Sequence, residues 1–534
     1  MIHCRNKLHK VHLGSIIWML TMAVFIVLTM ISVKYIVGVI FCLLLLAAYG
    51  LRPGSVLYNI TIENMTGVQY GCTIAVLLFT ILVCTIPMKV FPLWNGEIPE
   101  HRNQYELMAE NILEGRLHFD YGDEEELENL SNPYDPVERA ESGVKHHWDH
   151  AYYNGRYYMY FGVVPVFLVF LPYRIVTGMP LASYHATQLF VAFIITGLFV
   201  TFLLLCRLFF RKMPLVVYLV LSVALSVMSV SYSIVEPALY CTAITAGIAL
   251  EVWSLFFFIR AVWCEKNENK QIWNAAIGAL LGALVFGCRP PIALVNVVVI
   301  PVLMVFLKQH KLTMKLAGKL MLAALPYVIV AAALMLYNYA RFDDPFEFGQ
   351  KYQITEADQT QYGFKMSMDE LSRVFLNVKD SLFGITMPIK NFPYLRWSGL
   401  FINFPVLFFM FGCFGKKNRE SLKAMHLQYV VATMALLIVI ITTIDVLWTP
   451  FWLERYHMDV YFLAGLVCFI SIGLWYRVLN DKQKRGLNVI ICCLGFVTLV
   501  SCVFFFFIQI CSNPQWIFKV IVRRLSFGIL GGTD

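Results

Sequence analysis

The chain carries little charge for its length. Only 14% of its 534 residues are Asp, Glu, Lys or Arg, while 59% are hydrophobic and the mean hydropathy is +0.67. The alternation of apolar and polar residues that marks membrane β-strands is also missing. Continuous apolar runs recur instead, each long enough to cross roughly 30 Å of hydrocarbon as a helix. We therefore predict an all-α polytopic membrane protein, because helices satisfy every backbone polar group in lipid.

Three further absences narrow the class. The fourteen Cys show no disulfide or zinc spacing, and most lie inside apolar runs as small core residues do. No cleavable signal peptide is evident, because the first apolar run is followed almost at once by another. The net charge of +8 does not indicate nucleic-acid binding, since Lys and Arg are concentrated in short loops, where they set orientation.

About thirteen helices are predicted to cross the membrane, with the basic N-terminus in the cytoplasm. Their approximate ranges are 14–33, 35–51, 72–91, 184–206, 214–234, 238–259, 271–288, 291–308, 318–338, 399–414, 426–446, 457–477 and 487–511. Another apolar run, 160–178, contains Gly162, Pro165, Pro172 and Arg174. We predict that it dips into the membrane and returns, because this path leaves the basic loops that follow on the cytoplasmic side.

Acidic residues are concentrated in one polar segment. Residues 97–160 hold fifteen of the 34 acidic residues, and three crossings place them outside the cell. Apolar residues at helical spacing over 105–113 predict an amphipathic helix, which lies on the membrane surface or packs on another outer loop. The predicted parts are transmembrane helices at 1–92, an extracytoplasmic acidic loop with juxtamembrane and re-entrant segments at 93–183, transmembrane helices at 184–340, a second extracytoplasmic loop at 341–398, transmembrane helices at 399–511 and an interfacial tail at 512–534.

Several charged residues converge on the outer face. The acids are Asp149, in the sequence His-Trp-Asp-His, with Glu97 and Glu100 just past the third crossing. The cations are at the outer ends of four apolar runs: Arg289, Arg341, Arg396 and Arg455. A carboxylate can take the proton from an attacking hydroxyl, and guanidinium groups can neutralise a departing phosphate. Each residue also has an ordinary explanation, since an Arg at a helix end is commonly an interfacial anchor and the nearby tyrosines can form an aromatic belt.

Six patterns together resemble the GT-C glycosyltransferases, polytopic enzymes that use polyprenyl-phosphate sugars and include protein O-mannosyltransferases and the lipid A aminoarabinose transferase. The patterns are Gln104-Tyr105 with Gly115, Asn132–Pro136, Asp149–Gly162, Arg289-Pro290-Pro291, Asn338–Phe342 with Glu347-Phe348-Gly349, and Arg455-Tyr456 with Asp459. One feature departs from the family. Where better-known members have an Asp or an Asp-Glu pair, this chain has Arg102-Asn103-Gln104, so Asp149 or, second, Glu100 is the predicted base, or activity has been lost.

The resemblance implies transfer of a monosaccharide from a polyprenyl-phosphate carrier to a glycan, lipid or protein acceptor at the outer face of a bacterial plasma membrane. The predicted substrate contacts are Arg289, Arg341, Arg455, Tyr456, Tyr105, Tyr153, Arg156 and Tyr160. No metal is required, because arginine can supply the charge, although the acidic run Asp123–Glu126 leaves a divalent cation open. A flippase of lipid-linked glycans and a non-catalytic relative are the alternatives.

Overall fold

The computed structural model describes residues 56–86, 88, 103–237, 239–361, 367–385, 398–447 and 454–510. Within these ranges, eight helices are long and apolar enough to cross a membrane: Gly67–Thr85, Ser183–Phe209, Leu215–Ile234, Leu239–Cys264, Pro290–Gln309, Met314–Phe342, Gln428–Leu447 and Arg455–Val478. The predominantly helical membrane protein is thus confirmed in outline. The number of thirteen crossings stays a prediction, and the runs at 14–33 and 35–51 lie outside the described residues.

The centre of the bundle is α20 (Met458–Val478), which is almost completely buried. Around it lie α9 (Ser183–Phe209), α10 (Leu215–Val235) and α11 (Leu239–Ile259, continued by a π-helix Arg260–Cys264), with α4 (Gly67–Thr85) and α21 (Asp481–Ile510) packed against α10. Small residues let these helices approach closely. A Cβ on Gly473 would lie 2.5 Å from the ring of Phe210, and the rings of Phe202 and Phe469 stack 4.3 Å apart.

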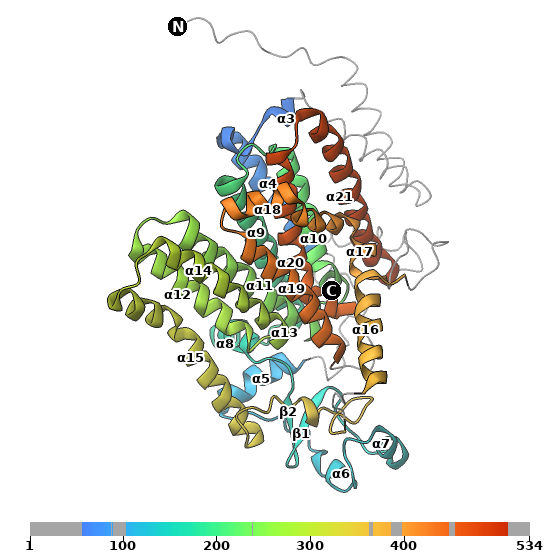
Figure 1. The fold of residues 1–534 in the computed structure, drawn as a ribbon. Coiled ribbons are helices and arrows are strands. Elements are labelled where there is room, and N and C mark those ends of the chain that lie inside the picture. Colours follow the sequence, from blue (N-terminus) through green and yellow to red (C-terminus); the bar gives the residue numbers. More distant parts are fainter. Residues whose placement is uncertain are drawn as a thin grey trace, which may run out of the picture.

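A second group of helices stands beside this centre (Figure 1). It contains α12 (Glu268–Val285), α13 (Pro290–Ala293), a 3-10 segment Leu294–Val298, α14 (Val299–Gln309) and α15 (Met314–Phe342). Along the chain, α15 is followed by α16 (Met368–Phe383), α17 (Leu400–Asn403), α18 (Lys416–Ala424) and α19 (Gln428–Leu447), which precede α20. Two short elements, α3 (Val56–Asn59) and a 3-10 turn Ile62–Asn64, precede α4.

Two of the predicted crossings within the described residues, 399–414 and 271–288, are not among the eight candidate spans. The run 399–414 forms α17 and then a separate ten-residue 3-10 helix, Pro405–Phe414, which begins at Pro405 because proline cannot donate a hydrogen bond back to α17. The run 271–288 forms α12, whose polar first turns keep it out of the eight candidate spans. Neither run is among the eight candidate spans, so both crossings stay predictions.

Two segments that are far apart in sequence build one polar layer at the end of the bundle (Figure 1). Its helices are α5 (Gln104–Leu113), α6 (Glu124–Glu128) and α7 (Pro136–Ser142), and a 3-10 turn Gln350–Tyr352 joins them from the second segment. An antiparallel hairpin, β1 (His150–Tyr153) with β2 (Arg156–Met159), departs from the all-α prediction. Its turn is Asn154-Gly155, and both residues have the positive φ that a tight hairpin turn requires.

The amphipathic helix predicted over 105–113 is confirmed as α5. Its apolar face packs on protein, against the π-helix Val166–Phe170 and α8 (Leu171–Thr177). Tyr105 stacks on Phe170 with ring centroids 5.1 Å apart, and Arg174 pairs with Glu110 at 2.7 Å. The apolar helix Val166–Thr177 is shorter than a membrane crossing, because twelve residues rise only about 18 Å.

Glu106 connects α5 to the start of α9. Its Oε1 accepts a hydrogen bond of 2.7 Å from the backbone N–H of Ser183, the first residue of α9, where a helix favours negative charge. Burial nevertheless raises the pKa of this carboxyl to about 7, although the Ser183 hydrogen bonds oppose the rise. Glu106 therefore titrates near neutral pH at the junction between the polar layer and the bundle.

Stability should depend on pH through this group. Folding raises the Glu106 pKa from 4.5 to about 7. The contribution of Glu106 to the free energy of unfolding is therefore fully present below about pH 4.5 and is lost as the pH rises through 7. Its upper limit is about 3 kcal/mol. We expect Glu106→Gln to remove this fall when thermal unfolding of the purified protein is followed from pH 5 to 8. Glu114→Gln, an exposed change at the end of the same helix, is the control; equal pH slopes for both variants would contradict the assignment.

Candidate active site

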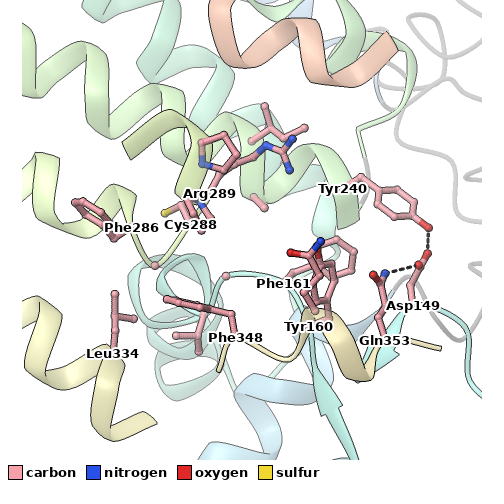
Figure 2. Close-up of a pocket in the computed structure, with 18 of the residues that line it drawn as sticks. Asp149, Tyr160, Phe161, Tyr240, Phe286, Cys288, Arg289, Leu334, Phe348 and Gln353 are labelled. Atoms are coloured by element: carbon pink, nitrogen blue, oxygen red, sulfur yellow. Dashed lines mark hydrogen bonds between the residues drawn. The ribbon is translucent and has the colours of Figure 1, made fainter. Parts of the chain in front are cut away.

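A cavity of about 500 Å³ lies where the polar layer meets the helix ends (Figure 2). Its wall comes from five parts of the chain that are far apart in sequence: Asp149 with 160–163, the start of α11, residues 286–291, the C-terminal end of α15 with 348–359, and Asp445 with Arg455-Tyr456. Both polar and apolar side chains line it. Of the sequence-predicted site residues, the structure brings six together here: Asp149, Tyr160, Arg289, Arg341, Arg455 and Tyr456.

Asp149 occupies a left-handed backbone conformation, with φ of +58°, immediately before β1. Its backbone N–H donates to Ile354 O and its carbonyl accepts from the Gln104 side chain, which fixes the turn. The carboxylate accepts hydrogen bonds from Tyr240 through Oδ2 and from Gln353 through Oδ1, the latter at 2.8 Å. Figure 2 shows the two donors reaching Asp149 from different parts of the chain, Tyr240 from α11 and Gln353 from the segment after the 3-10 turn Gln350–Tyr352. An ionised carboxylate can accept further hydrogen bonds at each oxygen, so a hydroxyl in the cavity can still donate to it.

Tyr240 links Asp149 to Arg455. The Arg455 guanidinium carbon lies 4.2 Å from the centroid of the Tyr240 ring and 5.6 Å from that of Tyr456. Among the residues that the structure describes, no carboxylate pairs with Arg455 and no hydrogen bond is made by its side chain. A guanidinium held by ring faces keeps its N–H donors for another acceptor. Arg455 is therefore a cation at the cavity wall that is suited to an anion.

Arg289 is differently placed, because two carboxylates neutralise it. Its Nε lies 2.7 and 2.9 Å from the two oxygens of Asp459, which is fully buried, and its Nη2 lies 3.9 Å from Asp445. The Tyr456 ring covers the guanidinium at 4.9 Å. Arg289 is therefore part of a buried charge cluster that joins α19, α20 and the turn before α13.

Arg341 is buried at the end of α15 and is held by neutral groups. Nη1 donates to Met159 O at 2.7 Å and Nη2 donates to Asn338 Oδ1 at 2.9 Å, while Nε has no partner among the described residues. The Tyr337 ring lies 3.9 Å from the guanidinium carbon. Arg341 thus ties the hairpin to α15, and within the described ranges no carboxylate forms a direct ion pair with it.

Gly162 allows the chain after the hairpin to reach the cavity. A Cβ at this position would lie 2.3 Å from Cys288 O and 2.4 Å from Gly287 O, so the two backbones touch. A hydrogen bond of 2.9 Å from Val164 N to Gly287 O holds them together. Tyr160 and Arg289 consequently face the same space. Burial raises the pKa of the Tyr160 hydroxyl to about 12, so it remains a hydrogen-bond donor at neutral pH.

Three predicted substrate contacts do not line this cavity. Tyr105 is fully buried beneath α5. The Tyr153 ring contacts Tyr352 in a tilted arrangement and Phe342 edge-on, and Arg156 is exposed at the start of β2. The positions of Glu97, Glu100 and Arg396 fall outside the described residues, so the alternative base stays a prediction.

The acidic run Asp123–Glu126 contacts protein groups. Asp123 pairs with His147 at 3.1 Å, Glu124 accepts from the backbone N–H groups of Tyr121 and Gly122, and Glu126 accepts from Lys145 N. Among the described residues there is no cluster of three or more His, Cys, Asp or Glu side chains that could hold a metal ion. These carboxylates order the polar layer around Asp149.

The sequence analysis missed three groups at the site: Tyr240, Gln353 and Asp445. Tyr240 lies at a helix end, where a tyrosine looks the same as an interfacial anchor. Gln353 belongs to a polar loop with no distinguishing pattern. Asp445 had a usable signal, because an acid inside an apolar run is a site candidate by default.

Comparison with models of known protein families, with curated proteins and with solved structures finds no match for this chain.

Proposed function

We propose that the protein is an integral membrane glycosyltransferase that moves a monosaccharide from a polyprenyl-phosphate carrier to a cell-envelope acceptor. The observation that carries the proposal is the cavity in which the Asp149 carboxylate and the Arg455 guanidinium contact the same side chain, Tyr240. A base and a cation without a carboxylate partner among the described residues lie on one wall, and they match the two charges that such a transfer must handle.

The donor's phosphate would lie at Arg455 and Arg341, the two cations without a carboxylate partner among the described residues. The apolar side of the cavity, with Phe286, Leu334 and Phe348, suits the first units of the lipid chain (Figure 2). Phosphate bound by guanidinium in a water-poor site is stabilised more strongly than in bulk solvent. The sugar is thereby directed toward Asp149.

The reaction would be a single displacement. The acceptor hydroxyl gives its proton to Asp149 while its oxygen forms a bond to the anomeric carbon. The bond from that carbon to the phosphate oxygen breaks, and the phosphate leaves with the electron pair. Arg455 and Arg341 neutralise the charge that develops on it. Attack from the side opposite the leaving group inverts the anomeric configuration.

The finer features of the proposal come from the sequence and its resemblance to the GT-C group. They are thirteen crossings, a location in a bacterial plasma membrane, an active site on the outer face, and a glycan, lipid or protein acceptor. Arginine supplies the charge that a divalent cation would otherwise supply, so the proposed step does not require a metal.

Arg455→Gln should weaken use of the donor. Losing one charge-assisted contact to phosphate costs about 1.5–3 kcal/mol, so we expect kcat/KM for the lipid-linked donor to fall roughly 10- to 100-fold. Arg156→Gln makes the same change at the exposed hairpin arginine and should leave kcat/KM unchanged. Steady-state transfer rates at varied donor concentration measure both. An equal loss in the two variants would remove Arg455 from the site.

The proposal is tested by transfer of radiolabelled sugar from a panel of polyprenyl-phosphate sugars. Membranes containing the full chain should move label from one donor to an acceptor, and membranes without the protein should not. If no donor gives transfer while labelled lipid crosses the bilayer, the protein is a flippase. If neither occurs with any donor in the panel, the proposed enzyme activity is rejected.

A further inference from the structure

A second cavity, an apolar groove of about 120 Å³, lies among α12, α14, α15 and the end of α11. It shares no residue with the first cavity and plays no part in the proposed transfer. The groove follows α12, α14 and α15. Gln271, Phe306 and Leu320 lie near the ends of these helices that adjoin their connecting loops. Ala279, Val299 and Tyr327 lie on the same three helices, farther from those loops. The groove therefore runs lengthwise for roughly 12 Å, about the length of eight helical residues.

The deep end of the groove is closed by a polar contact. Tyr327 donates a hydrogen bond of 2.5 Å to Asn296 Oδ1, and Asn296 Nδ2 lies 3.2 Å from the buried Glu251 carboxyl. Asn296 sits in the 3-10 segment Leu294–Val298, which interrupts the helical path between α13 and α14. The groove thus has a fixed floor, and a chain entering from the loop end stops at Tyr327.

The open end contains a polar atom that lacks a partner. Gln271 lines the groove and is only 3% exposed. Its Nε2 donates to Glu265 O at 3.0 Å, while its Oε1 accepts no hydrogen bond from any residue that the structure describes. A buried acceptor without a donor is costly, and a ligand with a hydroxyl group would satisfy it.

Basic side chains surround this end. Five exposed lysines flank the loops before α12 and between α14 and α15: Lys266, Lys270, Lys308, Lys311 and Lys315. Within the described ranges, none of them pairs with a carboxylate; the nearby Glu268 pairs with Lys319 and Glu265 pairs with Arg260. An apolar slot that opens among unpaired lysines at a helix end complements an anionic lipid.

We infer that this groove binds one acyl chain of an anionic phospholipid, with the lipid phosphate at the lysines and a headgroup or glycerol hydroxyl donating to Gln271. The site also bears on the first cavity through α15. That helix supplies Leu320 and Tyr327 to the groove and, farther along, Leu334 and Arg341 to the cavity. The same helix therefore lines both cavities.

The probe is phosphatidylglycerol, compared with phosphatidylcholine at equal concentration, on the full chain in detergent, with retained lipid counted by native mass spectrometry. Wild type should retain phosphatidylglycerol preferentially. Ala324→Phe fills the groove from an exposed position and should lower its retention at least about tenfold. Ala333→Phe, about two and a half turns along the same helix and exposed on the opposite side, should match wild type.

Charge is tested separately, with surface variants that leave the packing intact. Combining Lys270→Gln, Lys311→Gln and Lys315→Gln should reduce the preference for phosphatidylglycerol by about fivefold per lysine. The matched control combines Lys416→Gln, Lys417→Gln and Lys423→Gln on α18 and should keep the preference. The inference is overturned if wild type retains both lipids equally, if the two phenylalanine variants behave alike, or if the two triple variants lose preference equally.

Discussion

Replacing Asp149 with Asn should lower kcat for sugar transfer by about 10²- to 10⁴-fold, the range that a positioned general base contributes. The amide cannot take the acceptor's proton, yet it keeps the size of the carboxylate. Asn also tolerates the left-handed backbone of this position, where φ is +58°, so the turn before β1 should survive. KM for the donor should change little, because in the proposed site the arginines, and not Asp149, bind the phosphate.

Asp343→Asn is the matched control for this experiment. Asp343 has almost the same backbone conformation, with φ of +57°, but is exposed at the end of α15 and does not line the cavity. Its replacement should leave kcat and KM as in wild type. If Asp149→Asn transferred sugar at the wild-type rate, Asp149 would not be the base, and Glu100 would become the next residue to test.

Replacing Arg289 with Met should destabilise the protein by about 3–5 kcal/mol, which is the usual cost of removing one member of a buried ion pair. Asp459 is fully buried and contacts the guanidinium through both of its oxygens, so losing Arg289 leaves a buried carboxylate without the cation that it binds. The expected result is a large fall in the thermal unfolding temperature of the purified protein. We expect this fall without any substrate present.

The comparison variant is Arg174→Met. Arg174 and Glu110 are also 2.7 Å apart, but the Glu110 side chain is 46% exposed, so water can replace the lost partner and the cost should be no more than about 1 kcal/mol. Because the two ion pairs have the same distance but differ in burial, the difference between the two variants measures the effect of desolvation. Equal unfolding temperatures for the two variants would show that the Arg289 cluster does not hold the helix ends together.

The membrane helices were largely predictable, because lipid imposes a one-dimensional signal of length and hydropathy. The structure departs from that signal where a proline divides a run, as at Pro405, while polar first turns keep α12 out of the eight candidate spans. The hairpin was also predictable in principle. Asn154-Gly155 between tyrosine-rich segments is a strong turn signal, but the all-helical interpretation of the chain left it unused.

The candidate site was predictable only in part. Asp149 drew attention because it lies in the polar segment, and the arginines because they end apolar runs. Their unequal roles depend on distant partners: Tyr240 and Gln353 lie 91 and 204 residues from Asp149, and Asp459 lies 170 residues from Arg289. No local pattern reveals which arginine is neutralised by a carboxylate and which is left for a ligand. That distinction required the three-dimensional arrangement.

The central claim is that this cavity carries out one displacement at the anomeric carbon of a lipid-linked sugar. The most direct measurement is the anomeric configuration of the first product, determined by NMR after a single turnover with a donor of known configuration. We expect inversion, because in the proposed site Asp149 activates the acceptor opposite the phosphate bound by Arg455. Retention of configuration would contradict it, since that outcome requires two successive displacements.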